Sequence, residues 1–462
     1  MGSTFSFLQR VCKHTLWLVV PLLLLVACAQ EMTAPEATAT LLPLPQATAA
    51  ASMAGTATPA ATRATAAPGA ATAAGYTTFL PLAVASAPAR RPRPTPTPAP
   101  APTPAPTPTP IFPIYEGPPL PRDEIGVQIL LHGTDLDTIF QHLRTLEAGW
   151  LKAQISWKLY EPGEDRYDEV LLMELDQVVS RANNEGIKVL LSVAKAPDWT
   201  RPTNEMDGPP SDFDHYRDFM AFLATRYQGR VAAYELWNEP NLQREWNGMK
   251  LDAGELVRLI EDGAAGVRAA DPSALLVSAA PATTGINDGV IAIDDRVYLR
   301  AMFAHGVGNV VDAVGAHPYS WANPPDASAA APDPVAPTHN NHPSFFFADT
   351  LRDYRAIVDE AGYPELPLWV TEFGWGSFHG LGSEPPPGAE FMGYVDEWQQ
   401  AVYTLRAYEL AHERPNIGPL FLWNLNFAPT LGPEFVESGY SILRPDGSPR
   451  PVYYALGTIP KQ

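Results

Sequence analysis

Two glutamates, Glu239 and Glu372, each follow a short apolar run and lie within three residues of a tryptophan. A pair of carboxyl groups in different surroundings can serve as a proton donor and as a base or nucleophile, because burial and hydrogen bonds shift their pKa values apart. Either glutamate taken alone has a plain alternative, which is a solvated surface charge. The sequence therefore suggests acid–base and nucleophilic chemistry by carboxyl groups, provided that the fold brings the two side chains together.

Other catalytic chemistries lack the residues that they need. The sequence contains two cysteines, Cys12 and Cys28, so residues 29–462 have no thiol for a disulfide, a nucleophile or a zinc ligand. It also lacks the Gly-x-Ser-x-Gly elbow of serine hydrolases, a phosphate-binding loop and a His-Glu-x-x-His zinc motif. We therefore expect a site without a cofactor or a metal ion.

The charge of the chain argues against another class of partner. The net charge is −20, and the first 120 residues contain six basic and three acidic side chains, so residues 121–462 carry −23. A protein that binds along a phosphate backbone needs a basic surface. We therefore expect neither a nucleic acid nor an anionic lipid surface to bind this acidic segment, whereas a neutral or cationic partner fits.

Apolar or β-branched runs alternate with amphipathic stretches from residue 124 onward, which is the pattern of βα units around a parallel sheet. The predicted strands are 125–131, 150–156, 188–193, 233–237, 274–279, 313–316, 368–371 and 419–423. The predicted helices between them are 135–148, 169–184, 213–227, 253–270, 295–305, 349–361 and 392–411.

Eight such strands predict the α/β class and a (β/α)8 TIM barrel, in which active sites gather at the carboxyl ends of the strands. A doubly wound open sheet is the alternative, but no glycine-rich nucleotide loop follows the first predicted strand. Glu239 follows the fourth predicted strand and Glu372 the seventh. The barrel would therefore place both glutamates at the same rim.

The segments around the two glutamates match a known group of enzymes. Glu239 lies in YELWNEPN at 234–241, which resembles the Asn-Glu-Pro signature of the large clan of retaining glycoside hydrolases built on (β/α)8 barrels. The resemblance implies that Glu239 is the general acid/base and that Asn238 makes the hydrogen bond to the sugar 2-hydroxyl. The clan has its nucleophile at the end of strand seven. There Glu372 stands in WVTEFGW at 369–375, so the resemblance implies that it is the nucleophile.

Further residues match this clan at strand ends. After the sixth predicted strand, the segment GAHPY resembles the family 5 cellulases. The resemblance implies that Tyr319 orients the ionised Glu372, and that His317 lies near the acid/base or the bound sugar. A partly buried histidine with satisfied hydrogen bonds is the alternative for His317. Trp423, which closes the eighth strand, matches the clan's aromatic platform beneath the sugar, and a core tryptophan is its alternative.

The eleven tryptophans of the chain, taken together, favour a carbohydrate as the partner. Trp199, after the third predicted strand, is a further candidate for contact with the sugar. Other tryptophans that follow strands, each as well suited to the core as to a cleft, are Trp157, Trp321 and Trp375.

Some positions depart from the clan's pattern. Many members have an arginine on or after strand two and a histidine after strand three. Here Lys152 and Gln154 lie on the second predicted strand, and Lys195 follows the third. The segment 157–167, with Glu-Pro-Gly at 161–163, resembles the β-xylosidases of family 39 instead. The family, the sugar, its linkage and the choice between exo and endo action therefore stay open.

Cleavage of a glycosidic bond explains why two carboxyl groups are needed. The oxocarbenium-like transition state requires a proton for the leaving group on one side and a negative charge on the other. Retention needs carboxyl groups about 5 to 5.5 Å apart, whereas inversion leaves about 6.5 to 9.5 Å for a water molecule. We expect the shorter separation, with Glu239 protonated and Glu372 ionised. A transglycosylase that uses the same residues and a surface protein that only binds carbohydrate are the competing hypotheses.

Residues 1–28 have the pattern of a bacterial lipoprotein signal peptide. Arg10 and Lys13 precede an apolar run that ends in LVAC at 25–28, a sequence resembling a lipobox. The resemblance implies that Cys28 is acylated and anchors the protein to the bacterial cell membrane from outside the cytoplasm. An ordinary signal peptide and a secreted protein are the alternative.

Residues 29–120 are predicted to be a disordered linker rich in Ala, Thr and Pro, followed by a glycoside hydrolase domain at 121–462. Residues 31–120 contain 20 prolines, and every second residue of 91–110 is proline. That pattern favours polyproline II, with a length of roughly 60 Å over twenty residues. No role is predicted for the apolar segment 79–84 or for the long segment 323–342 after the sixth strand, and none for the oligomeric state.

Overall fold

The computed structural model describes residues 111–462. The predicted lipoprotein signal with Cys28, the segment 79–84 and the linker up to residue 110 lie outside these described residues. In the described part, no helix is both long and apolar enough to cross a membrane.

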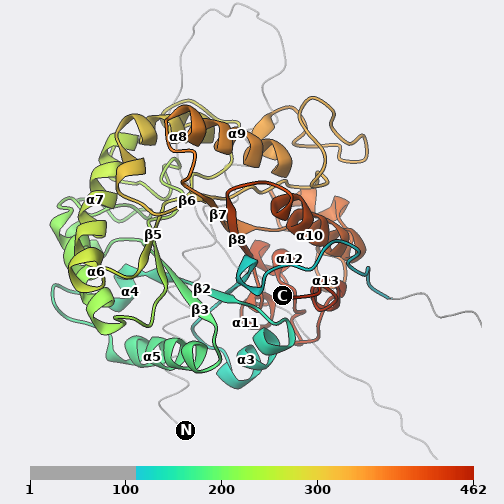
Figure 1. The fold of residues 1–462 in the computed structure, drawn as a ribbon, viewed down its shortest axis with the longest axis horizontal. Helices are drawn as coiled ribbons and strands as arrows, with labels where there is room; N and C mark the ends of the chain where they lie inside the picture. Colours follow the sequence, from blue (N-terminus) through green and yellow to red (C-terminus); the bar gives the residue numbers. More distant parts are fainter. Residues whose placement is uncertain (1–110) are drawn as a thin grey trace, which may run out of the picture. The chain divides into compact units, whose positions relative to one another are not determined.

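Eight parallel strands form a nearly closed barrel (Figure 1). Along the sheet their order is β5-β4-β3-β2-β1-β8-β7-β6. A parallel bridge between Val277 and Ala313, and a hydrogen bond of 3.0 Å from the Ser278 N–H to the Ala313 carbonyl, join the two edges. The strands are β1 (Ile125–Ile129), β2 (Trp150–Ser156), β3 (Lys188–Ala194), β4 (Ala233–Leu236), β5 (Leu275–Ser278), β6 (Val314–Ala316), β7 (Leu368–Phe373) and β8 (Ile417–Leu422). The predicted (β/α)8 barrel is therefore confirmed.

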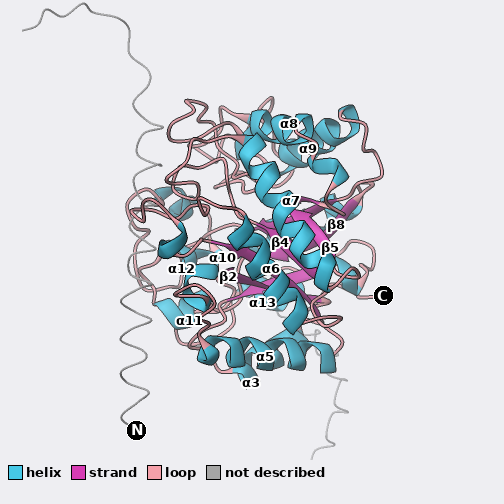
Figure 2. Ribbon diagram, turned by 90° about the vertical axis from the view of Figure 1, so that its left-hand side faces the viewer, coloured by secondary structure: helices cyan, strands magenta, loops and turns pink. Residues whose placement is uncertain are grey.

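Helices surround the strands, as Figure 2 shows. Those between successive strands are α3 (Leu136–Thr145), α5 (Glu169–Asn184), α6 (Asp214–Arg226), α7 (Ala253–Ala270), α8 (Asp295–Ala304), α9 (Phe347–Glu360) and α10 (Glu397–His412). Shorter pieces, absent from the sequence prediction, are α4 (Trp157–Tyr160), α11 (Phe427–Leu431), α12 (Val436–Tyr440) and α13 (Pro451–Leu456). The predictions for α5 and α7 match the observed bounds.

The prediction that one helix runs from 392 to 411 is wrong at its start. Residues Glu390–Tyr394 form a 3₁₀ turn, and α10 begins only at Glu397. Asp396 caps it in a capping box, in which its side chain accepts from the Gln399 N–H and the Gln399 side chain accepts from the Asp396 N–H. This reciprocal cap satisfies backbone donors that would otherwise have no partner, so it fixes the start of the helix there.

Side chains of alternate strand residues fill the barrel interior in layers. One of these layers is apolar and contains Trp150, Leu190, Ala233, Val277, Ala313, Trp369 and Phe421. Since strand side chains alternate in direction, residues two positions further on project into the same interior. On three of these strands they are Lys152, Ser192 and Glu235, all fully buried. A polar layer thus lies between the apolar layer and the carboxyl rim.

Candidate active site

The structure brings Glu239 and Glu372 together at the carboxyl rim of the barrel. Glu372 is the fifth residue of β7, and Glu239 stands three residues after the end of β4. His317, just after β6, lies between them, with its Nδ1 3.2 Å from Glu239 Oε1 and 3.9 Å from Glu372 Oε2. These two oxygens are therefore no more than 7.1 Å apart, the sum of the two distances. Both side chains retain some exposure, 13% for Glu239 and 9% for Glu372.

Several donors surround the Glu372 carboxylate. The Tyr319 hydroxyl donates to Oε2 over 2.9 Å, and the Lys152 ammonium donates to Oε1 over 3.2 Å. With its amide turned to match both neighbours, Gln128 donates to Oε1 at 3.3 Å and accepts from the Trp423 indole N–H at 3.2 Å. These groups fit a negatively charged carboxylate held in one orientation. The predicted contact of Tyr319 with Glu372 is present.

Lys152 and Glu235 form a fully buried ion pair beneath Glu372. Lys152 Nζ lies 3.0 Å from Glu235 Oε2 and also donates to the Thr371 carbonyl at 3.0 Å. The contact with Glu235 is an ion pair rather than an aligned hydrogen bond. Burial lowers the pKa of Lys152, but the charges of Glu235 and Glu372 outweigh this effect and raise the pKa above its usual value. The lysine therefore remains cationic.

Sequence reasoning treated Lys152 as a departure from the family pattern and assigned no role to Glu235. A signal was present, because both are charged residues within otherwise apolar strands. A charge at such a position must be paired to be buried at tolerable cost. The identity of the partner depends on the register of neighbouring strands, which the sequence does not show.

Arg244 and His317 hold the Glu239 carboxylate. Arg244 Nη2 donates to its Oε2 at 2.7 Å, while His317 Nδ1 faces its Oε1. Burial raises the pKa of Glu239, but the hydrogen bond with His317 and the charge of Arg244 outweigh burial, so the pKa lies below its usual value. The expectation that Glu239 is protonated in the free protein is therefore wrong, because His317 and Arg244 stabilise the carboxylate.

The histidine and the glutamates are electrostatically coupled. Burial lowers the pKa of His317, but the charge of Glu372 and the hydrogen bond with Glu239 outweigh it and raise the pKa. This shift agrees in direction with the lowered pKa of Glu239, so His317 and Glu239 favour the charged pair. His317 thus lies next to Glu239.

The backbone around Glu239 is strained and firmly held. Trp237 has φ +86° and Glu239 has φ +42°, a left-handed region that costs energy for residues other than glycine. The Glu239 N–H donates to the Ala280 carbonyl at 3.1 Å. Asn241 accepts from the Ala282 N–H at 2.7 Å and donates to the Ala282 carbonyl at 2.9 Å. Contacts with the segment after β5 thus hold the strained turn.

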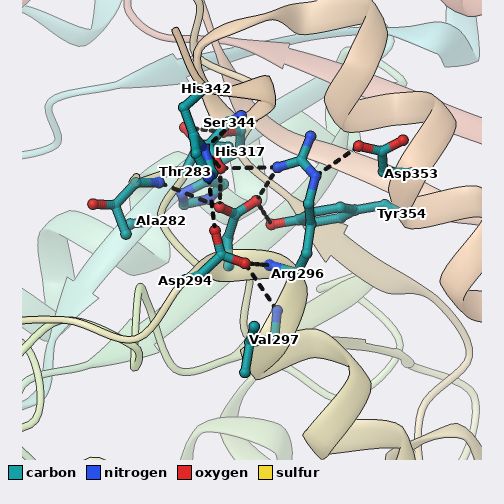
Figure 3. Close-up of polar contacts among 12 residues, drawn as sticks. Ala282, Thr283, Asp294, Arg296, Val297, His317, His342, Ser344, Asp353 and Tyr354 are labelled. Carbon is teal, nitrogen blue, oxygen red and sulfur yellow. Dashed lines mark hydrogen bonds and ion pairs between the residues drawn. The ribbon is translucent and has the colours of Figure 1, made fainter. Parts of the chain in front are cut away.

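A buried polar network lies beside His317 and contacts its backbone (Figure 3). Thr283 Oγ1 donates to the His317 carbonyl at 3.2 Å. Next to it, Arg296 donates to Asp295 at 2.8 Å and to Ser344 at 2.9 Å, and it reaches Asp353 at 2.7 Å. The Tyr354 hydroxyl completes the network by donating to Asp295 at 3.1 Å.

Asn238 and Trp423 both lie at the rim beside the glutamates. Asn238 is buried, and its Oδ1 has no hydrogen-bond partner within residues 111–462. Trp423 is partly buried, and its ring meets Tyr440 at 5.0 Å and Tyr319 at 6.0 Å between centroids. Trp423 is thus an edge of an aromatic wall rather than a fully enclosed core residue.

Comparison with known proteins places the chain in a family. The family model described as cellulase (glycosyl hydrolase family 5) matches residues 126–427, which include all eight strands except the first residue of β1. The chain belongs to glycosyl hydrolase family 5. This match covers well over half of the 462 residues.

Individual proteins similar to this family 5 chain share a low sequence identity with it. A beta-xylosidase from Geobacillus stearothermophilus is 26% identical over 172 residues, which are 36% of this chain and 32% of that protein. The matched region thus spans about a third of the length of this curated relative. A family 39 glycoside hydrolase from the gut symbiont Bacteroides cellulosilyticus WH2 superimposes with a TM-score of 0.56 and 22% identity, over 74% of this chain and 64% of that one.

A further solved structure, a glucosidase from Croceicoccus marinus, superimposes on this family 5 chain with a TM-score of 0.51 and 14% identity. The match covers 74% of this chain and 69% of that one. At these identities the structural matches support the barrel fold alone.

The other tryptophans of this family 5 protein differ in burial. Trp157 and Trp375 are fully buried, which makes them core residues and excludes the cleft-lining role considered for them. Trp321 is partly buried and stacks on His339 at 5.1 Å between ring centroids, so the segment 323–342 packs against it. Trp199 donates to the Glu161 carbonyl at 3.0 Å, and no hydrogen bond within the described residues links it to the two glutamates. Its contact with a sugar stays a prediction.

Proposed function

We propose that this protein is a retaining glycoside hydrolase with Glu372 as nucleophile and Glu239 as general acid/base. The observation that carries the proposal is the shared contact of both carboxylates with His317, which keeps their facing oxygens within 7.1 Å. This upper bound on one pair of oxygens is compatible with the retaining separation. The clan resemblance favours retention.

The first step would form a glycosyl–enzyme. The Glu372 carboxylate attacks the anomeric carbon, the bond from this carbon to the glycosidic oxygen breaks, and protonated Glu239 gives its proton to the departing oxygen. The donors Lys152 and Tyr319 hold Glu372 so that one oxygen points at the carbon.

The second step would release the sugar. Glu239, now ionised, takes a proton from water as the water oxygen attacks the anomeric carbon, and the bond to Glu372 breaks. Arg244 and His317 stabilise the ionised form of Glu239, which is the form that acts as the base in this second step. In the first step the same two groups oppose protonation, so the fraction of enzyme with a protonated acid limits the rate at neutral pH.

The surroundings of the glutamates fit a sugar ring. Trp423 offers a partly exposed aromatic surface for the apolar face of the ring. Asn238 has a free side-chain oxygen within the described residues, next to Glu239 in sequence, for a sugar hydroxyl. We propose that these two residues bind the sugar that Glu372 attacks.

Substitution of each glutamate tests the assignment. We expect Glu372→Gln to lose hydrolysis of a panel of aryl glycosides by at least about a thousandfold. We expect Glu239→Gln to regain turnover with azide on substrates that have good leaving groups, because these need no proton from the acid. The matched control is Glu365→Gln, an exposed residue just before β7, which should retain activity. Wild-type activity in both active-site variants would contradict the proposal.

Product analysis separates hydrolysis from transglycosylation, because the two reactions share both glutamates and differ only in whether water or a sugar accepts the glycosyl group. Oligosaccharides of xylan, β-glucan, mannan and arabinan are suitable substrates. Shorter sugars with retained anomeric configuration, measured early by NMR, support the proposed hydrolase. Longer products would instead show a transglycosylase, and binding without turnover would show a carbohydrate-binding protein.

We also propose that the enzyme acts outside the cytoplasmic membrane, anchored through acylated Cys28. The LVAC sequence at 25–28 and the proline-rich linker support this proposal. Metabolic labelling with a fatty acid and cell fractionation test it. We expect Cys28→Ala to lose the label and leave the membrane fraction, and an unchanged distribution would contradict the anchor.

A further inference from the structure

Four cationic side chains lie at the carboxyl rim, and one of them, Arg244, contacts Glu239. Lys158 lies in α4, after β2, and Lys195 follows the end of β3. Arg201 follows the short turn after β3, and Arg244 lies in the segment after β4. These four residues are called the cationic cluster below. Since all four follow strands, they lie at the rim that holds the two glutamates.

Loops after β3 and β4 hold the cluster in place. Asp207 pairs with Lys158 at 2.5 Å and with Lys195 at 3.2 Å. The Asp207 carbonyl accepts from the Asn247 N–H at 2.9 Å, and Arg201 donates to the Asn247 carbonyl at 3.0 Å. The two loops thus form one rigid unit around the cations.

Glycine is required where these loops meet. A Cβ at Gly208 would lie only 2.2 Å from the Asn247 carbonyl oxygen. Any other residue would force the loops apart, so this close approach adds to the rigidity of the unit.

Positive charge exceeds negative charge in the cluster below neutral pH. Arg244 contacts Glu239 at 2.7 Å and lies 4.0 Å from Glu245. Burial raises the pKa of Glu245 to about 7, even though Lys195 and Arg244 act in the opposite direction. The other carboxyl groups near these cations are Asp207, Glu239, Asp198 beside Arg201, and Glu437, whose pKa burial also raises. When Glu245 and Glu437 are protonated, four cations face three carboxylates. Such a surplus stands out in a segment whose net charge is −23.

The cations are the more exposed members of their ion pairs. The exposed fraction of the side chain is 28% for Lys158 and 16% for Lys195, against 10% for Asp207. It is 21% for Arg244, against 13% for Glu239. The Nε–H groups of Arg201 and Arg244 have no acceptor in residues 111–462. These two Nε–H groups are themselves buried, so the donors that a ligand can reach are the partly exposed ends of Lys158, Lys195 and Arg244.

The opposite side of the rim is aromatic. Tyr319, Trp321 and Trp423 follow β6 and β8 and are partly buried against an apolar cluster that includes Phe391 and Tyr440. In the strand order, β6 and β8 lie across the barrel from β2 and β4. A sugar ring that stacks on the aromatic side can therefore reach the cationic side with a polar substituent at its edge.

We propose that the cationic cluster binds an anionic substituent, a carboxylate or a sulfate ester, on a sugar next to the scissile bond, so that the substrate is an acidic glycan. The inference rests on the proposed glycoside hydrolase function and names its substrate class. Ammonium and guanidinium groups form short, charge-assisted hydrogen bonds with both kinds of anion. The acidic surface of the domain as a whole is screened beyond about 8 Å at physiological ionic strength, so it does not exclude such a substrate.

Binding of the anion would also prepare the acid. An anion that pairs with Arg244 competes with Glu239 for the guanidinium. Withdrawal of this charge makes Glu239 easier to protonate, as the first step of hydrolysis requires. Recognition of the substrate and proton donation are thereby linked at one side chain.

Matched substrate pairs test the inference. One pair is a uronic-acid oligosaccharide and the same compound with its carboxyl groups reduced to alcohols, and the other is a sulfated oligosaccharide and its desulfated form. We expect kcat/KM to be at least about tenfold higher for the acidic member of one pair, and the pair that responds identifies the anion. We expect Lys195→Gln to reduce this preference to about threefold or less.

The matched control variant is Lys188→Gln, because Lys188 begins the same strand β3 at the opposite, amino-terminal rim. It should keep the full preference. Equal or lower kcat/KM for the acidic members of both pairs, with hydrolysis that still depends on Glu239, would overturn the inference and leave the proposed function intact.

Binding measurements decide the matter if no substrate is hydrolysed, an outcome that would remove the proposed function. Calorimetry with the unmodified protein and the same four oligosaccharides is then the readout. Tighter binding of an acidic member, lost in Lys195→Gln and kept in Lys188→Gln, supports the cluster as an anion site. Equal affinity within both pairs overturns the inference. Thermal unfolding of both variants shows whether they are folded.

Discussion

Lys152 and Glu372 are 220 positions apart in the chain, and yet the Nζ of one lies 3.2 Å from the Oε1 of the other inside the barrel. The lysine also pairs with Glu235 at 3.0 Å, and the side chains of this pair are completely buried. Lys152 therefore has two separable roles, since it neutralises a buried carboxylate and orients the proposed nucleophile.

Substitution of Lys152 should affect both stability and turnover. Lys152→Met removes the closest cation from the buried Glu235 carboxylate and leaves only His317, at 3.9 Å, so we expect the free energy of unfolding to fall by about 3 to 5 kcal/mol. We expect kcat to fall about a hundredfold, because Glu372 loses a cationic donor. Urea unfolding and steady-state kinetics measure the two effects.

A double variant separates the two roles of Lys152. In Lys152→Met with Glu235→Gln, the buried carboxylate is gone, and most of the lost stability should return. The kcat should stay low, because Glu372 still lacks the ammonium group that donates to its Oε1. If the double variant regained wild-type kcat, Lys152 would serve only to neutralise Glu235.

Arg244 should set the pH range in which the enzyme works on neutral substrates. Its charge helps to hold the pKa of Glu239 below the usual value, and kcat/KM requires Glu239 to be protonated in the free enzyme. Arg244→Met removes this charge, so the pKa of Glu239 rises and the alkaline limb of the pH profile moves to higher pH, by about one unit. The profile of kcat/KM for an uncharged aryl glycoside measures the shift.

A control variant distinguishes this effect from a general change of surface charge. Arg258 on α7 is an exposed arginine, with 65% of its side chain accessible, and it pairs with Glu255. Arg258→Met should leave the alkaline limb where it is. A limb that stays in place or moves to lower pH in Arg244→Met would contradict the assigned role of Arg244.

The network behind His317 should be needed for stability. Arg296 pairs with Asp295, whose side chain is fully buried, and also contacts Ser344. Arg296→Met leaves this carboxylate without its cation, so we expect a loss of about 3 to 5 kcal/mol in the free energy of unfolding. Arg352→Met is the comparison, since Arg352 is 61% exposed and its ion pairs should contribute less than about 1 kcal/mol. Similar losses for both variants in urea unfolding would show that the buried network contributes no more to stability than an exposed ion pair does.

The barrel and its two glutamates could be predicted from the sequence because they depend on local patterns. Buried parallel strands appear as short apolar runs, and Glu239 and Glu372 each follow one of them. The order of strands along the chain then determines which residues reach the same rim. The contact of Tyr319 with Glu372 is instead what the resemblance of GAHPY to the family 5 cellulases implies.

The charged partners could not be predicted in this way. The pairing of Lys152 with Glu235 depends on which residues of different strands lie at the same level inside the barrel, and that level is set by register and closure. The position of Arg244 depends on the conformation of an irregular loop with strained residues at Trp237 and Glu239, for which no periodic pattern exists. The unexpected state of Glu239 is a consequence of that loop.

Glu245 provides a last test, through the pH dependence of stability. Burial raises its pKa to about 7, so the folded protein binds this proton more tightly than the unfolded chain does. The stabilising contribution is therefore complete below about pH 4.5, and it is lost as the pH rises through about 7. In Glu245→Gln this loss cannot occur. We expect the variant to gain stability relative to the wild type between pH 5 and pH 8, by an amount on the order of 2 kcal/mol.

Urea unfolding at several pH values in this range measures the difference. Asp207 and Glu239 do not obscure it, because their pKa values are lowered and their contributions are lost only as the pH falls toward the acid range. Glu205→Gln, at an exposed position of the loop after β3, serves as the control and should follow the wild type at every pH. If Glu245→Gln also followed the wild type, Glu245 would be ionised throughout this range. The cationic cluster would then lack the charge surplus that the proposed anion site needs below pH 7.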